Sequence, residues 1–202
     1  MARVKTEEKR RAILEAAAAV FAKRGYHATT VGQIAKHLDM GLGTFYRYFQ
    51  SKLDVFHAVI EEVMGEVTLV LASESPTAST SLSEYRTQVE RIARALFAAF
   101  QKNRSLARLL FVEAPGISVE LNEKLQAAVT FFGSSTQAYL DNGVARGFLR
   151  PALDTELTAL AINSMIFEGV RHVAAAGEAT EVLERWIAAS TGLMFEGISI
   201  RP

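Results

Sequence analysis

Hydrophobic residues recur at helical spacing along most of this 202-residue chain. Near the N-terminus, Ile13, Ala17 and Phe21 lie on one face of a helix predicted over about residues 6–24. Gly25 follows at the position where many helices end on a left-handed residue, a conformation that glycine adopts without steric cost. No segment shows the sustained alternation of apolar and polar residues that is typical of a half-buried strand. The pattern therefore predicts an all-α protein.

Two short helices joined by a tight turn are predicted next. Residues 31–38 carry apolar side chains in the i, i+3, i+4, i+7 pattern, and the Thr-x-x-Gln sequence from Thr30 is typical of a capping box. After a three-residue interruption, a second helix is predicted over about residues 42–49. Phe45 and Phe49 lie one turn apart in it, so we expect both rings to face the preceding helices.

Longer helical patterns fill the rest of the chain. They are predicted over about residues 52–71, 84–102, 104–112, 119–146, 155–176 and 180–196, which makes about nine helices in all. A Ser/Thr-rich stretch over residues 73–83 separates the first two of these, and we expect it to be a mobile linker. The chain is therefore predicted to comprise a three-helix head over residues 1–57 and a larger helical domain over residues 58–202.

The last two predicted helices are apolar around much of their circumference. So wide an apolar face suits a subunit interface in which two helices from each protomer form a four-helix bundle. An interior helix of a monomer is the alternative, because it also buries two faces. The predicted interface residues are Leu160, Val182, Leu183, Trp186, Ile187, Ala189 and Leu193.

Composition and charge narrow the function. The absence of cysteine excludes disulfides, thiolate nucleophiles and Cys-based metal sites. The N-terminus is too polar for a secretion signal and the apolar run over residues 16–22 is too short to span a membrane, so we expect a cytoplasmic protein with no membrane partner. Residues 1–58 hold 10 Lys/Arg and 5 Asp/Glu (net +5), whereas the remainder holds 12 and 17 (net −5). The basic N-terminal part suggests a polyanionic partner.

No pattern of catalytic or metal-ligating residues emerges. The chain has no Gly-x-Ser-x-Gly, P-loop or dinucleotide fingerprint, and its four histidines lack the spacing of metal ligands. The adjacent Glu61 and Glu62 point in different directions on a helix, which is more typical of a solvated face than of a catalytic dyad. We therefore expect neither an enzyme nor a bound cofactor or metal.

The second short helix carries residues that suit contact with DNA. A helix in the major groove reads base edges while flanking groups hold phosphates. Its first residues and its arginine are placed to approach bases. Its tyrosines, and the lysine that follows the helix, are placed to hold phosphates. The start of the preceding helix is placed to meet the other wall of the groove. Ordinary surface or packing roles are the alternative for each residue. The predicted DNA-binding residues are Thr30, Val31, Gln33, Leu42, Gly43, Thr44, Tyr46, Arg47, Tyr48 and Lys52.

The segment Gly-Thr-Phe-Tyr-Arg-Tyr-Phe-Gln-Ser-Lys, from Gly43 to Lys52, resembles the signature of the tetracycline-repressor (TetR) family of bacterial transcription regulators. The resemblance extends over residues 9–58. It implies a homodimer whose two recognition helices enter successive major grooves of a near-palindromic, double-stranded operator. It also implies that a small molecule bound in the C-terminal domain spreads the two heads. By position, the family's DNA contacts correspond to Thr44, Tyr46, Tyr48 and Lys52, with Gly43 and Arg47 nearby.

The predicted function is that of a ligand-responsive, sequence-specific DNA-binding regulator. The resemblance implies a repressor that is associated with the nucleoid while on its operator and is released by a small effector of unknown identity. The aromatic residues on the later helices predict an apolar or aromatic effector, and we expect the protein to be cytoplasmic. The chain departs from the family pattern at Asp39, Gly41, Leu42 and Tyr48. These departures leave open an alternative, a helical ligand-binding or interaction module with degenerate DNA binding.

The effector pocket is less legible than the DNA-binding region. Aromatic and methionine residues at helical spacing on the middle and late helices can line a pocket, although an ordinary core is the commoner reading of such a set. Polar residues among them can orient a ligand. The candidate pocket residues are Phe97, Phe100, Phe111, Phe131, Phe132, Asn163, Met165, Phe167, Glu168, Arg171 and His172.

Overall fold

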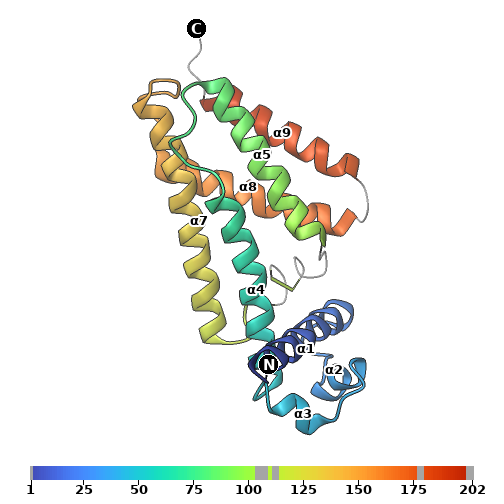
Figure 1. Cartoon of the computed structure of the whole chain (residues 1–202). Helices are drawn as coiled ribbons and strands as arrows, with labels where there is room; N and C mark the ends of the chain where they lie inside the picture. The colour runs from blue at the N-terminus through green and yellow to red at the C-terminus, as the bar shows by residue number, and fades with distance from the viewer. Residues whose placement is uncertain (1, 103–108, 111–113, 177–179, 199–202) are drawn as a thin grey trace. The chain divides into compact units, whose positions relative to one another are not determined.

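The computed structural model describes residues 2–102, 109–110, 114–176 and 180–198, and the elements within these ranges are helical (Figure 1). The all-α prediction is therefore confirmed. The helix expected over residues 104–112 lies largely outside the described residues. The helices are α1 (Ala2–Arg24), α2 (Val31–His37), α3 (Leu42–Tyr46), α4 (Lys52–Ala72), α5 (Leu82–Lys102), α7 (Val119–Ala145), α8 (Thr155–Ala176) and α9 (Thr180–Ile198).

Two helix boundaries differ from the sequence-based prediction by three or more residues. Helix α1 begins at Ala2 rather than near residue 6. Helix α3 ends at Tyr46 rather than at Phe49, because the chain tightens at that point into three-residue turns. The amides of Arg47 and Tyr48 donate to the carbonyls of Thr44 and Phe45 at 3.3 and 2.9 Å, a spacing that is common in the last turn of a helix.

The chain forms two compact units, Met1–Gly65 with Asn103–Asn122, and Glu66–Lys102 with Glu123–Pro202. Helices α4 and α7 each pass from one unit into the other. The predicted domain boundary at residue 57 differs from the limit of the first compact segment at Gly65, and it stays a prediction.

The first unit has an aromatic core that supports its short helices. Phe21 of α1, Phe45 of α3 and Phe56 of α4 are completely buried, and the rings of Phe21 and Phe56 meet edge to face with their centroids 5.0 Å apart. Gly25 ends α1 with a φ of 80°, and its amide donates to the carbonyl of Phe21 at 2.7 Å. The predicted left-handed residue at this position is thus confirmed.

In the second unit α5, α8 and α9 pack against one another (Figure 1). Gly169 of α8 allows the close approach of α9, because a Cβ atom at this position would lie 2.2 Å from Nε1 of Trp186. None of the described helices has an apolar stretch long enough to cross a membrane. The buried core cluster comprises Tyr85, Tyr139, Leu140, Leu149, Ala159, Ile162, Met194 and Phe195.

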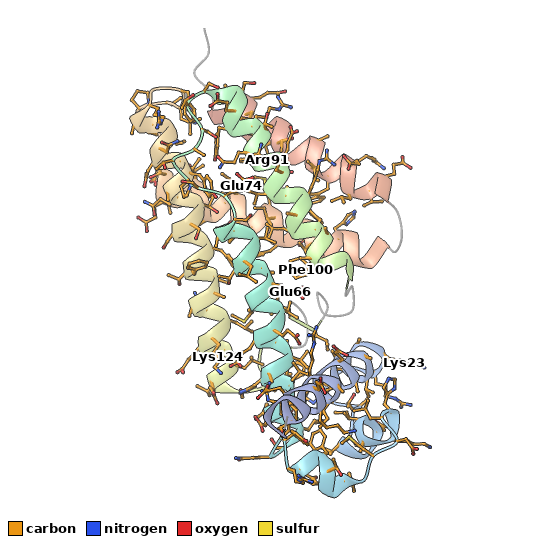
Figure 2. The ribbon with its side chains drawn as sticks, viewed as in Figure 1. Lys23, Glu66, Glu74, Arg91, Phe100 and Lys124 are labelled. Atoms are coloured by element: carbon orange, nitrogen blue, oxygen red, sulfur yellow. The ribbon has the colours of Figure 1, made fainter. Side chains whose placement is uncertain are left out.

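The Ser/Thr-rich connection between α4 and α5 is anchored by hydrogen bonds, and its expected mobility stays a prediction. The Tyr139 hydroxyl donates to the carbonyl of Glu74 and the Asn142 amide to that of Ser79, both at 2.9 Å. The Glu74 carboxylate also pairs with Arg91 of α5 at 2.9 Å (Figure 2). The composition of the α4–α5 connection indicated an irregular backbone. The side chains that hold this backbone in place are distant in sequence.

Candidate nucleic-acid interface

The start of α2 is set by the predicted capping box. Thr30 has extended backbone angles, and its hydroxyl oxygen accepts a hydrogen bond from the Gln33 amide at 3.3 Å. The Gln33 side-chain oxygen accepts in return from the Thr30 amide at 3.0 Å. Two amides that would otherwise lack an intrahelical partner are satisfied in this way, and the capping box is confirmed. The side-chain oxygens of Thr30 and Gln33, both candidate DNA contacts, are thus already engaged in the capping box. Val31, the third candidate in this segment, is half-buried.

The turn between α2 and α3 depends on one left-handed residue. Asp39 has a φ of 49°, a conformation that Asp tolerates better than most residues with a side chain. The next amide, that of Met40, donates to the carbonyl of Ala35 at 3.0 Å. Gly41 then returns to an extended conformation with a φ of −71° and begins α3. The residue that departs from the family pattern at position 39 therefore still makes a tight turn.

Helix α3 is held from its inner side by two phenylalanines. Phe45 is completely buried and Phe49 is 1% exposed, and their ring centroids lie 5.9 Å apart. The guanidinium carbon of Arg10, on α1, lies 5.0 Å from the centroid of the Phe49 ring. This packing leaves the opposite face of α3 exposed, as the spacing of the phenylalanines predicts.

The exposed face of α3 contains most of the predicted base-reading residues. Leu42 is 50% and Tyr46 54% exposed, although both side chains are large and mainly apolar. Gly43 and Arg47 are also exposed, whereas Thr44 and Tyr48 are half-buried. A short helix with a buried inner face and an exposed outer face of this composition is suited to insertion into a groove.

Lys52 connects the start of α4 to the α1–α2 turn. Its Nζ donates to the carbonyl of Tyr26 at 2.8 Å and lies 4.2 Å from the centroid of the Tyr26 ring. Burial raises the pKa of the Tyr26 hydroxyl. Since an ammonium group has three donors, the Lys52 side chain can hold this carbonyl and still donate to a phosphate. The sequence indicated a cation here but contained no signal for the bond to Tyr26.

The N-terminus of α4 is capped by the side chain of Ser51. The Ser51 hydroxyl accepts from the Asp54 amide at 3.0 Å, and the Asp54 carboxylate accepts from the Gln50 amide at 2.7 Å. Further exposed cations that we did not single out from the sequence lie at the ends of the preceding helices, namely Lys23 of α1 (Figure 2) and Lys36 of α2. The sequence signal for these two cations was their position in the last turn of a helix, where the helix dipole favours positive charge.

In the second unit several candidate effector-binding residues lie in the interior. Phe97 and Phe100 of α5 are buried. Phe132 of α7 and Phe167 of α8 meet edge to face with their ring centroids 5.9 Å apart. Asn163 of α8 is 6% exposed. Its side-chain oxygen accepts from the Thr136 hydroxyl at 2.9 Å, while its Nδ2 has no hydrogen-bond partner among the described residues.

The remaining candidates lie nearer the surface or outside the described residues. The exposed Glu168 and Arg171 form an ion pair at 2.7 Å. The exposed His172 ring lies 5.6 Å from the Trp186 ring, and Phe131 is 46% exposed. Met165 is half-buried against the core cluster, and Phe111 lies outside the described residues.

The predicted interface residues fall into two groups. Leu183 and Ile187 are buried within their own unit, and Val182 and Trp186 are half-buried. The residues of the second group point outward: Leu160 is 44% and Leu193 66% exposed, and Ala189 is exposed too. Leu157 of α8, which was not among the predicted residues, is 62% exposed.

Comparison with known proteins places this arrangement in context. The family described as "Bacterial regulatory proteins, tetR family" matches residues 13–59. An uncharacterized HTH-type transcriptional regulator of Bacillus subtilis, YhgD, is 30% identical over 155 residues, which are 75% of this chain and 77% of that protein. The fatty acid metabolism regulator protein of the same organism is 27% identical over 161 residues, 78% and 79% of the two chains. The structure of FadR from Bacillus subtilis in complex with stearoyl-CoA aligns with a TM-score of 0.76 at 22% identity, covering 93% of this chain and 98% of that one.

Proposed function

The chain belongs to the tetR family of bacterial regulatory proteins, and from this premise we propose that it is a homodimeric repressor that a small apolar effector releases from its operator. It is a DNA-binding transcriptional regulator through its helix-turn-helix. The observation that carries the proposal is the outer face of α3, where Leu42 and Tyr46 are exposed while Phe45 is completely buried. Arg47, directly after the helix, is exposed too.

We expect the residues of α3 and its flanks to divide the work of recognition. Leu42, Thr44 and Arg47 face base edges, while Tyr48 and Lys52 hold phosphates. Gly43 lets the backbone come close to the DNA, because it adds no side chain to the exposed face. Thr30 and Gln33 act mainly through the capping box, which orients α2 and presents Val31 to the groove wall.

A binding selection tests the DNA-binding part. The purified protein is offered a pool of random-sequence duplexes and the enriched fraction is sequenced. We expect a near-palindromic motif whose half-sites lie about one helical turn or a multiple of it apart. Its affinity should fall steeply with rising salt, because bound phosphates release counterions. If a folded dimer enriches no motif at low salt, the protein is instead a ligand-binding module with degenerate DNA binding.

The proposed effector carries a long acyl chain, and the proposal draws on two observations. FadR, whose fold this chain shares, is in complex with stearoyl-CoA in its crystal structure. In this chain, Phe97 and Phe100 of α5 are buried, and the Phe132 ring of α7 meets the Phe167 ring of α8, so apolar side chains that suit an apolar ligand are present on these helices. A buried amide without an acceptor is costly, so the Nδ2 of Asn163 is a suitable donor for a carbonyl oxygen of the effector.

Addition of stearoyl-CoA to the operator complex tests the effector class. Binding is followed by fluorescence anisotropy, with coenzyme A alone as the control. A useful switch corresponds to a weakening of about 5- to 150-fold. Asn163→Leu should reduce this response while operator affinity without effector is retained. The neighbouring Ser164→Ala, which removes an exposed hydroxyl bonded to its own helix, should not. An operator complex that is indifferent to stearoyl-CoA would reject this effector class and leave the DNA-binding proposal standing.

A further inference from the structure

An exposed apolar patch stands at the start of the recognition helix. Leu42 is the first residue of α3 and Tyr46 the last, so the two are one turn apart and lie on the same face. Half or more of each side chain is open to solvent. The other large side chain of α3, that of Phe45, is completely buried, so this patch is not an extension of the core. The patch is therefore exposed surface within its own compact unit.

The two positions that flank Leu42 carry no side chain, and the fold itself does not require this. Gly41 has a φ of −71°, and neither Gly41 nor Gly43 adopts the positive φ that favours glycine. A Cβ atom at either position would meet nothing within 4 Å. The protein alone would therefore accommodate the Cβ atom of an alanine at either position. Because neither glycine has a side chain, the Leu42 side chain is free on both sides for a partner surface that approaches the backbone closely.

The ring of Tyr46 is held in a defined direction beside Leu42. It meets the buried Phe45 ring edge to face, with centroids 5.6 Å apart and planes at 89°. Phe45 in turn packs on Phe49. Because this packing already restricts the Tyr46 ring, the ring loses little further conformational freedom when a partner covers it.

We propose that Leu42, with the Tyr46 ring as its neighbour, recognises the C5-methyl group of a thymine in each half-site of the operator. The inference rests on the proposed function, because it takes α3 as the helix that enters the major groove. The thymine methyl is the one apolar group on the base edges of that groove, and cytosine lacks it. A leucine cannot form hydrogen bonds to a base, so its discrimination comes from covering this methyl group.

Exposed cations at the end of α2 and directly after α3 fit the same partner. Arg47, one residue after Tyr46, is exposed, and so is Lys36 in the last turn of α2. These cations suit phosphates or a guanine edge. An apolar patch that a cation directly follows along the chain matches a thymine methyl within a polyanion better than it matches an apolar protein surface.

Substitution of single thymines by deoxyuridine tests the inference, because it removes the methyl group and leaves base pairing intact. Each thymine of the selected operator is replaced in turn, and the Kd is measured at one salt concentration for the wild type and for Leu42→Ala. We expect a position at which the wild type binds uracil about fourfold more weakly per methyl group. Leu42→Ala should bind thymine and uracil equally there. Tyr46→Phe, which keeps the ring, should retain the preference.

Three results would overturn the inference in distinguishable ways. If the wild type binds its operator equally with uracil at every position, methyl recognition is wrong and the DNA-binding function stands. If Leu42→Ala keeps the full preference for thymine, another residue reads the methyl group. If the folded wild type enriches no operator at all, the proposed function fails and the inference fails with it. Circular dichroism of Leu42→Ala confirms that the variant is folded.

Discussion

Neighbouring residues of α3 serve opposite purposes. Phe45 is completely buried, while Tyr46 directly after it is 54% exposed. A helix advances by about 100° per residue, so adjacent positions face different surroundings. Stability and recognition can therefore be changed separately within this short helix.

Phe45→Ala and Tyr46→Ala form a matched pair that tests this separation. Phe45→Ala should lower the free energy of unfolding by about 3–5 kcal/mol, because it leaves a cavity in the core. Tyr46→Ala should lower it by about 1 kcal/mol or less, since the ring loses only its contact with Phe45. Urea denaturation measures both values, and anisotropy at a temperature where both variants are folded measures operator affinity. Equal destabilisation by the two substitutions would contradict the assignment of inner and outer faces.

Lys52 is expected to matter for stability as well as for DNA. Lys52→Met keeps much of the apolar stem but removes the charged hydrogen bond to the Tyr26 carbonyl, so the free energy of unfolding should fall by about 1–3 kcal/mol. Affinity for all DNA sequences should also fall, with a shallower salt dependence. Lys36→Met is the control: its side chain is exposed, and stability should change by about 0.5 kcal/mol or less. An unchanged melting curve for Lys52→Met would show that the bond to Tyr26 contributes nothing.

At the level of elements, the α4–α5 connection is held by side chains from two helices. Arg91 and Gln88 of α5 reach the Glu74 carboxylate, and Tyr139 of α7 reaches the carbonyl of the same residue. A loop with several such bonds has lost most of its freedom in the folded state. We infer that the end of α4 is fixed within its unit, so that any effector-driven movement of this helix must occur nearer its N-terminal end.

The Glu74–Arg91 pair makes a prediction for acid stability. The hydrogen bond from Arg91 lowers the pKa of the Glu74 carboxyl below its ordinary value of 4.5. The unfolded chain therefore takes up this proton first as the pH falls. The stabilisation is complete above about pH 4.5 and is lost as the pH drops through the folded-state pKa. Glu74→Gln should thus be less stable at neutral pH and show a shallower decline below pH 4.5.

Urea denaturation at a series of pH values measures this difference. Arg91→Leu should show the same shallower decline, because it removes the principal cause of the lowered pKa. A wild type and a Glu74→Gln variant with parallel profiles would contradict the prediction.

For the whole molecule, dimerisation is proposed to occur through the outward faces of α8 and α9. Leu193 is 66% exposed, so a charge there is tolerated in the monomer but not in an apolar interface. Leu193→Glu should dissociate the dimer in sedimentation experiments while its circular dichroism is retained. It should also weaken operator binding strongly, because the two half-sites are then bound independently.

Leu69→Glu serves as the control for dimerisation. Leu69 of α4 is 72% exposed and belongs to the same compact unit, but it lies outside the proposed interface. Its substitution should leave the oligomeric state unchanged. If Leu193→Glu remains as dimeric as Leu69→Glu, the interface lies elsewhere.

The sequence by itself determined the local features of this protein. It predicted the helices of the described residues to within a few positions, the capping box at Thr30 and the left-handed Gly25, and its signature segment indicated the family. Each of these depends on residues only a few positions apart, whose hydrogen bonds and backbone sterics act within one turn. The inner placement of Phe45 and Phe49 followed from helical periodicity for the same reason.

Tertiary structure alone decided how distant residues meet. It directed the Lys52 ammonium to the Tyr26 carbonyl, anchored the α4–α5 connection and left the buried Asn163 amide without a partner among the described residues. It also decided that, of the apolar residues of α9, Ile187 is buried and Leu193 is exposed. Periodicity shows that a helix has apolar faces, but which face is covered depends on elements far away in the chain. No spacing within a single helix carries that information.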